Sequence, residues 1–174
     1  MKKKVFQGKI IGLSVHDVVI EGRKVRREYI EHRGAAAMLG FDEKGKVILV
    51  KQHRFPHGYV LEIPAGTLEK GEDPISCAFR EMIEETGYSA KKMTHILSFY
   101  PSIGYNSEII HCYHATGLKK VQEIKPDNDE FISVVKMDLK KVVQLIKTGK
   151  ITDSKTICAV LTFAAKKSKL DKLA

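Results

Sequence analysis

Several features of membrane, secreted and multidomain proteins are missing from this sequence. Its 174 residues contain no apolar run that approaches the roughly 18 residues of a membrane helix. The basic start, MKKKVFQGKIIGL, has no small-residue cleavage site, and Gln7, Gly8 and Lys9 interrupt its apolar residues, so we expect no secretory signal. No repeat, low-complexity tract or Pro/Gly-rich linker divides the chain. These absences predict one domain of ordinary size, with at most a small appended element and no membrane partner.

Cysteine is scarce as well. Only Cys77, Cys112 and Cys158 are present, and no two of them form a CxxC pair. An odd number at wide spacing argues against a disulfide framework and favours a reducing compartment, so we expect free thiols and a cytoplasmic protein. Apolar residues make up 43% of the chain, which is enough for a hydrophobic core and excludes disordered and fibrous classes.

Acidic residues are outnumbered, with 21 Asp and Glu against 30 Lys and Arg, which gives a net charge of +9. A basic balance is typical of proteins that bind nucleic acid, an anionic surface or a polyphosphate substrate. The lysines are scattered, and neither interleaved aromatic residues nor a recognition-helix pattern accompanies them. We therefore expect most of them on a solvated surface.

The first third of the chain alternates between apolar and polar residues. This pattern predicts strands over Val5–Leu13, His16–Glu21 and Lys24–Glu31, with a turn at Glu21-Gly22 between the last two. The strands have exposed polar positions and little local core. We predict that residues 1–34 form a small antiparallel sheet that needs a neighbour, and that residues 35–174 form the main domain.

The main domain mixes strands and helices. Asp73 is a good N-cap, Pro74 suits the first helical position and Gly87 suits the left-handed end, so a helix is predicted between them. Further helices are predicted over Asp138–Thr148 and Asp153–Lys167. The predicted strands are Ala35–Gly40, Lys46–Gln52, Tyr59–Ile63, His95–Tyr100, Glu108–Ala115 and Phe131–Lys136. The order of these elements predicts an α+β or α/β sandwich.

Residues 80–87, REMIEETG, crowd carboxylates onto this first helix. Glu84 and Glu85 lie three and four positions after Glu81, which places them on one flank of the helix. Without a counter-ion the three groups repel and raise one another's pKa. The cluster is therefore either a solvent-exposed acidic patch or a site for a hard divalent cation such as Mg²⁺ or Mn²⁺.

The flanking residues favour the cation site. Gly66 lies six positions before Glu72, which lies eight before Arg80. With REMIEETGY this completes the pattern G-x5-E-x7-R-E-U-x-E-E-x-G-U, where U is a bulky apolar residue, and the chain thereby resembles the Nudix hydrolases. Seven fixed identities coincide by chance with a probability on the order of 10⁻⁸ or less. Met82 and Tyr88 occupy the two U positions.

The resemblance implies an α/β/α sandwich with a mixed sheet, an α+β fold, and two or more Mg²⁺ or Mn²⁺ ions. Glu81 and Glu85 are implied as the main ligands, helped by Glu84 and the carbonyl of Ala65. Glu72 joins a further ion or the outer shell. Arg80 is expected to pair with these carboxylates, notably Glu72, and so to serve catalysis together with Glu84. Gly66 is expected to let the loop turn sharply and approach a phosphate.

Two further segments, LEIPAGTLEKGE at 61–72 and VKQHRFP at 50–56, resemble the ADP-ribose and nucleotide-sugar pyrophosphatase branch. That branch implies Arg54 and Glu62 at the substrate, and Glu108 in a matching loop. It also implies a homodimer that exchanges the N-terminal sheet, from which Arg27 and Tyr29 reach the partner's base pocket. Ile103 departs from the proline that is usual in this branch, which leaves room for nucleotide sugars other than ADP-ribose.

The resemblance places a general base on the loop with sequence DNDE. We predict Glu130 in this role, with Asp127 and Asp129 as reserves, against the alternative of an acidic turn. The predicted reaction splits a nucleoside diphosphate sugar into a nucleoside monophosphate and a sugar phosphate. Two alternatives remain, namely a non-catalytic sensor or nucleic-acid-binding module, and a hydrolase of dinucleoside polyphosphates, RNA caps or oxidised nucleotides.

Overall fold

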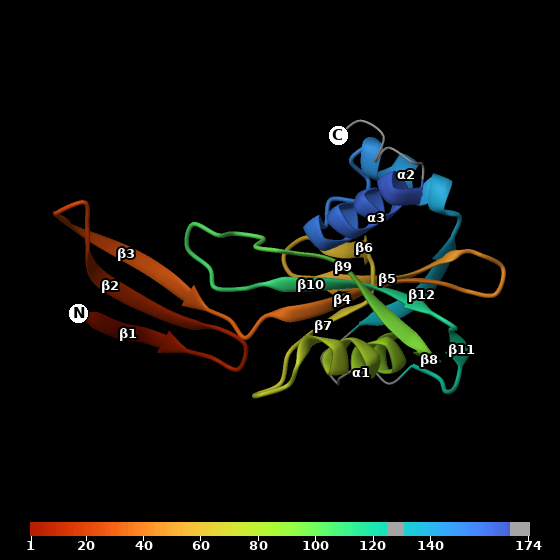
Figure 1. Ribbon diagram of the computed structural model, residues 1–174, viewed down its shortest axis with the longest axis horizontal. Helices are drawn as coiled ribbons and strands as arrows, with labels where there is room; N and C mark the ends of the chain where they lie inside the picture. Colours follow the sequence, from red (N-terminus) through yellow and green to blue (C-terminus); the bar gives the residue numbers. More distant parts are fainter. Residues whose placement is uncertain (125–130, 168–174) are drawn as a thin grey trace.

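A computed structural model describes residues 1–124 and 131–167. A small antiparallel sheet extends from the main body of the molecule (Figure 1) and has the order β1-β2-β3. Its strands are β1 (Lys2–Gln7), β2 (Gly12–Ile20) and β3 (Arg23–Glu31). The predicted sheet is thus present, and the predicted turn joins β2 to β3 with φ of 49° at Glu21 and 76° at Gly22.

One strand prediction in this sheet is wrong. Val5–Leu13 was expected to be continuous, but it contains the turn between β1 and β2. The N–H of Gly8 donates to the carbonyl of Ile11 at 2.8 Å, which reverses the chain. The apolar residues Ile10 and Ile11 lie in the turn and resemble the residues of a strand, so the sequence pattern alone could not locate the break.

The main sheet has seven strands and is mixed. Its order is β12-β5-β4-β10-β9, with β6 paired to β5 and β7 paired to β4. β4 and β10 are parallel and the other pairs are antiparallel. The strands are β4 (Ala35–Phe41), β5 (Val47–Arg54), β6 (Gly58–Glu62), β7 (Ala65–Thr67), β9 (Lys92–Phe99), β10 (Ile110–Thr116) and β12 (Ile132–Met137). The run VILV in β5 is buried, as expected for an interior strand.

Two short strands were not predicted. β8 (Tyr88–Ser89) and β11 (Lys119–Lys120) pair with each other in a separate ladder. Each has only two residues, which is too short to show a period. β7 was also unpredicted, because its three residues, Ala-Gly-Thr, are too few to show a period and include a glycine, which is depleted in strands.

Helices cover both faces of the main sheet, as predicted for an α/β/α sandwich (Figure 1). α1 (Pro74–Thr86) lies on one face, and α2 (Leu139–Lys147) and α3 (Ser154–Lys167) lie on the other. Alternate residues of the central strands divide into two cores. Leu39 and Leu49 pack in the core with Val142 and Ala159, whereas Met38 and Ile48 pack in the core with Ala78 and Met82.

The ends of α1 follow the sequence signals. The carboxylate of Asp73 accepts the N–H groups of Ile75 and Ser76, both at 3.1 Å. Gly87 has φ 72°, and its N–H donates to the carbonyl of Ile83 at 2.7 Å. The buried side of the helix differs from a purely apolar face, because Ile75 is 41% exposed while Glu85 is buried.

The N-terminal sheet is tied to the loop between β9 and β10. The N–H of Ile30 donates to the carbonyl of Tyr105 at 2.7 Å, and the N–H of Ser107 donates back to Ile30 at 2.9 Å. Ser107 also donates its hydroxyl to the carbonyl of His32 and accepts the N–H of His32. The predicted substrate loop is therefore anchored on the end of β3.

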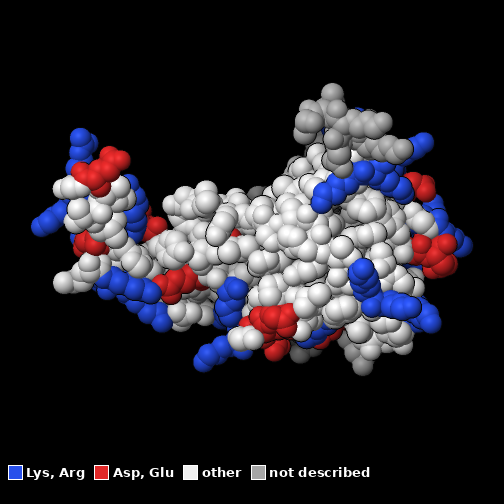
Figure 2. Space-filling model, in the orientation of Figure 1, with Lys and Arg blue, Asp and Glu red and all other residues white. Residues whose placement is uncertain are grey.

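The distribution of surface charge and the state of the cysteines match the predictions from the sequence. Lys and Arg side chains are spread over the N-terminal sheet and the main body on the face drawn in Figure 2, and acidic side chains lie among them. Cys77, Cys112 and Cys158 are free. Across residues 1–124 and 131–167, no helix has the length and apolar character needed to cross a membrane.

Candidate active site

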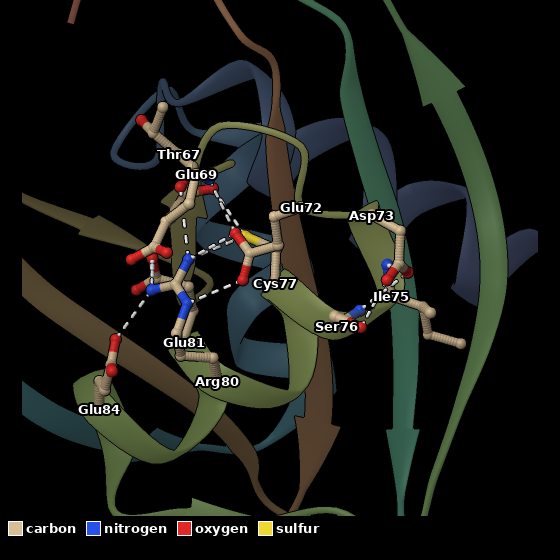
Figure 3. Close-up of polar contacts among 11 residues, drawn as sticks. Thr67, Glu69, Glu72, Asp73, Ile75, Ser76, Cys77, Arg80, Glu81 and Glu84 are labelled. Atoms are coloured by element: carbon tan, nitrogen blue, oxygen red, sulfur yellow. Dashed lines mark hydrogen bonds and ion pairs between the residues drawn. The ribbon is translucent and has the colours of Figure 1, made fainter.

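The guanidinium of Arg80 is the centre of a carboxylate cluster (Figure 3). Its Nε and Nη2 donate to the two oxygens of Glu72, each at 2.9 Å. Its Nη1 donates to Glu81 at 2.6 Å and to Glu84 at 2.9 Å. The expected pairing of Arg80 with Glu72 is therefore present. It fixes the loop before α1 to the flank of the helix through a bidentate charged contact.

Glu85 lies on the inner side of the same helix. It is only 3% exposed, and its Oε2 accepts the N–H of Ala65 at 2.8 Å. A buried carboxylate is stable in the ionised form only where hydrogen bonds or positive charge stabilise it. This contact joins α1 to the start of β7. It places Glu85 beside Ala65, whose carbonyl the family resemblance implies as a metal ligand.

Gly66 has a different role from the sharp turn that was predicted. It lies within β7, paired with Ala36, and it is not among the glycines with positive φ. A Cβ built on Gly66 would lie 1.8 Å from the Cδ of Glu81. The absence of a side chain at Gly66 therefore leaves the space in which the Glu81 carboxylate packs against the β7 backbone.

Charge sets the ionisation of the cluster. Hydrogen bonds from Arg80 hold the pKa of Glu72 below its usual 4.5, although burial opposes this. Hydrogen bonds to Glu72 raise the pKa of Arg80, again against the effect of burial. Burial, reinforced by Glu72 and Glu81, raises the pKa of the neighbouring Cys77 thiol to about 12. Cys77 is thus a neutral packing residue at this site.

The donor set suits a hard divalent cation. Glu72, Glu81 and Glu84 surround a single guanidinium, and Glu85 lies on the same helix, so negative charge is in excess. Each carboxylate has two oxygens, which lets it bond Arg80 and a cation together. Within the described part of the chain, no three His, Cys, Asp or Glu side chains already form a group that could hold a metal ion. Three of these glutamates converge instead on Arg80.

Comparison with known proteins identifies the family of this chain. The profile of the NUDIX domain matches residues 31–160. The chain belongs to the Nudix family. The predicted enzyme class, a Nudix pyrophosphohydrolase, is thereby confirmed.

Two curated relatives and one solved structure are informative. The chain is 43% identical over 162 residues to an ADP-ribose pyrophosphatase of Bacillus subtilis (strain 168), covering 91% of this chain and 88% of that protein. It is 34% identical to a GDP-mannose pyrophosphatase of Yersinia enterocolitica, covering 78% of this chain and 75% of the relative. The crystal structure of an ADP compounds hydrolase superposes with a TM-score of 0.79 at 19% identity, covering 97% and 93% of the two chains, and supports the fold.

A second polar group adjoins the Nudix motif. Arg54 donates its Nε and Nη2 to the two oxygens of Glu62, at 2.9 and 3.0 Å. Burial alone would raise the pKa of Glu62, but the Arg54 hydrogen bonds and the charge of Lys155 keep that pKa below its usual value. The sequence predicted Arg54 and Glu62 as separate substrate contacts, and the structure pairs them with each other. Lys155 was not predicted, because no local pattern distinguishes it from other helix lysines.

The remaining predicted residues lie elsewhere. Arg27 and Tyr29 are on β3 of the N-terminal sheet, which is separate from α1 within one chain (Figure 1). The N–H of Glu108 donates to the Asn106 side chain at 2.9 Å, in the loop tied to β3. The predicted general base Glu130 and its reserves Asp127 and Asp129 fall outside the described residues.

Replacing Arg80 with methionine is expected to destabilise the metal-free protein by about 2 kcal/mol at neutral pH, because it deletes several hydrogen bonds to charged groups. The folded-state pKa of Glu72 lies below 4.5, so its stabilisation is present above that value and is lost as the pH falls through the lowered pKa. The deficit of the variant should therefore shrink in acid. Urea unfolding with EDTA at several pH values measures this, and a deficit independent of pH would contradict it.

Proposed function

We propose that this Nudix enzyme hydrolyses the diphosphate bond of ADP-ribose or another nucleoside diphosphate sugar, with a divalent cation, to a nucleoside monophosphate and a sugar phosphate. The observation that carries the proposal is the Arg80-centred carboxylate cluster beside the Arg54–Glu62 pair. Similarity to an ADP-ribose pyrophosphatase and a GDP-mannose pyrophosphatase supports the substrate class.

Each member of the cluster has an assigned role. Glu81 and Glu85 hold Mg²⁺ or Mn²⁺ together with Glu84 and the Ala65 carbonyl, and Glu72 serves a second ion or orients the others. When bound, such ions neutralise charge on the phosphoryl oxygens and lower the pKa of the attacking water. Arg80 keeps the carboxylates in place by its hydrogen bonds.

Substrate contacts come from several elements. Arg54 binds the diphosphate, Glu62 lies at the substrate beside it, and the loop residue Glu108 is a further substrate contact. Glu130 accepts the proton of the attacking water, with Asp127 and Asp129 as the nearest substitutes in sequence.

An activity screen tests the proposal. ADP-ribose, GDP-mannose, UDP-glucose, NADH and diadenosine polyphosphates are incubated with Mg²⁺, and the products are separated by anion exchange. We expect a nucleoside monophosphate and a sugar phosphate from at least one nucleotide sugar, and none in EDTA. Turnover of dinucleoside polyphosphates alone would assign another Nudix substrate class. Tight, salt-dependent RNA binding without any turnover would favour the sensor or nucleic-acid-binding module.

We also propose that residues 1–34 mediate a homodimer around the hydrolase domain of residues 35–174, in the cytoplasm. The N-terminal sheet exposes large apolar side chains along its length, and a partner chain would remove them from water. They are Val5, Phe6, Ile10, Ile11, Val19 and Ile20. In such a dimer Arg27 and Tyr29 approach the base-binding pocket of the partner.

Val19→Asp is expected to dissociate this dimer. Val19 is 64% exposed in the single chain and would be covered in the dimer, so the substitution would bury an unpaired carboxylate. Light scattering after gel filtration measures the mass of each variant. Lys44→Gln changes the net charge by the same one unit in the exposed turn between β4 and β5 and serves as the matched control. A monomeric wild-type chain, or a dimer that Val19→Asp leaves unchanged, contradicts the proposal.

A further inference from the structure

Lys155 is a charged side chain held inside the protein at the start of α3. Only 11% of it is exposed, and its Nζ forms ion pairs with Glu62 and with Asp153, the latter at 2.9 Å. Asp153 in turn accepts the N–H and the hydroxyl of Thr156, at 2.9 and 2.6 Å, as the N-cap of α3. Lys155 is therefore fixed by the helix cap on one side and by Glu62 on the other.

Glu62 thus forms ion pairs with two cations, Lys155 and Arg54, which differ in their exposure to solvent. The Glu62 side chain is 3% exposed, Lys155 is 11% exposed, and Arg54 is 43% exposed. Arg54 donates to both oxygens of Glu62 and also lies near enough to Glu85 and Asp153 for their charges to act on it. Lys155 is the buried partner of Glu62, and Arg54 is the partner that solvent and ligands can reach.

The position of this group ties it to the Nudix motif. Glu62 is three residues before Ala65, whose N–H donates to Glu85 at 2.8 Å. The N–H of Ile63, directly after Glu62, donates to the hydroxyl of Thr156 at 2.8 Å. The segment from Glu62 to Ala65 is therefore attached to α3 at one end and to the carboxylate cluster of α1 at the other.

We propose that Lys155 is a positioning residue. It is the permanent counter-ion of Glu62, and it lets the Arg54 side chain move its hydrogen bonds from Glu62 to the diphosphate of the substrate. This inference rests on the proposed function, in which Arg54 contacts the diphosphate. The planar fork that now bonds a carboxylate bidentately suits two phosphoryl oxygens equally well. Once Arg54 leaves, Glu62 keeps the Lys155 ion pair, and no buried charge is left without a partner.

Lys155→Met tests this role. With Lys155 gone, Arg54 can reach the substrate only by leaving Glu62 as an unpaired buried charge. We expect KM for the nucleotide sugar to rise about 10- to 100-fold while kcat changes by less than about 3-fold. Lys155→Arg keeps the cation and should restore most of the affinity. Lys166→Met removes a charge from the exposed end of the same helix and should leave KM unchanged.

A double-variant cycle separates this role from a general loss of packing. In a Glu62→Gln background there is no buried carboxylate to compensate, so adding Lys155→Met should change KM by less than about 2-fold. An equal rise in KM in both backgrounds overturns the proposal. If Lys155→Met does not fold by circular dichroism, Lys155→Gln, which keeps a donor toward Glu62 without the charge, takes its place in the cycle.

The two proposals fail in different ways. If the wild-type enzyme hydrolyses no nucleotide sugar, the proposed function is wrong and the role of Lys155 is wrong with it. If the wild-type enzyme turns over ADP-ribose or GDP-mannose and Lys155→Met has an unchanged KM, only the role of Lys155 is overturned.

Discussion

Glu85→Gln is expected to lower kcat by about 1,000-fold or more while leaving the fold intact, because a cation site depends on the charge of its ligands. Glu85 is 3% exposed, and its Oε2 accepts the N–H of Ala65. Glutamine has the same shape, and its amide oxygen can accept that N–H as well. The substitution therefore preserves the structural contact between α1 and β7 while it removes the negative charge and exchanges the other oxygen for an NH2 group.

The measurement is kcat against Mg²⁺ concentration for a nucleotide sugar that the wild-type enzyme hydrolyses, together with the melting temperature. Glu43→Gln changes an exposed carboxylate in the β4–β5 turn and serves as the matched control. Glu84 is the outermost glutamate of the cluster, with its side chain 44% exposed, and Glu84→Gln should have a smaller effect. Undiminished turnover in Glu85→Gln would remove the basis for the proposed mechanism.

Gly66→Ala is expected to reduce kcat by about 100-fold, since misplacing a catalytic group by about an ångström has costs of that order. The added Cβ would lie 1.8 Å from the Cδ of Glu81, so that carboxylate has to move. Its movement also breaks the hydrogen bond with Arg80. We expect a loss of about 1–3 kcal/mol in stability, which is typical of overpacking at a close contact.

Gly104→Ala is the matched control for stability. A Cβ at Gly104 meets no atom within 4 Å, and its φ is not positive, so the alanine fits without strain. Its melting temperature should equal that of the wild type. If Gly66→Ala keeps full turnover, the contact between the β7 backbone and Glu81 does not position Glu81 for the metal-binding role that we propose.

The predictions that the structure confirms concern mainly local contacts. The caps of α1 need only Asp73, Pro74 and Gly87, whose effects act within a helical turn. The pairing of Arg80 with Glu84 needs only helical spacing. These features were predictable because the interacting atoms are close in the sequence.

The missed features depend on distant segments. The break at Gly8 to Ile11 is set by the pairing of β1 with β2. Lys155 meets Glu62 across 93 positions of the chain. No local pattern carries information about such a contact.

The sequence by itself determined the chemistry of this protein, since the spacing from Gly66 to Tyr88 identifies a Nudix motif and places three glutamates on one helix. The tertiary structure alone decided how that chemistry is held. It buries Glu85 against Ala65, seats Glu81 on the bare backbone of Gly66, and joins Arg54, Glu62 and Lys155 from three elements. The physical reason is the distance along the chain over which each kind of interaction acts. Helical spacing acts over a few residues, whereas burial and charge compensation depend on which distant segments the sheet brings together.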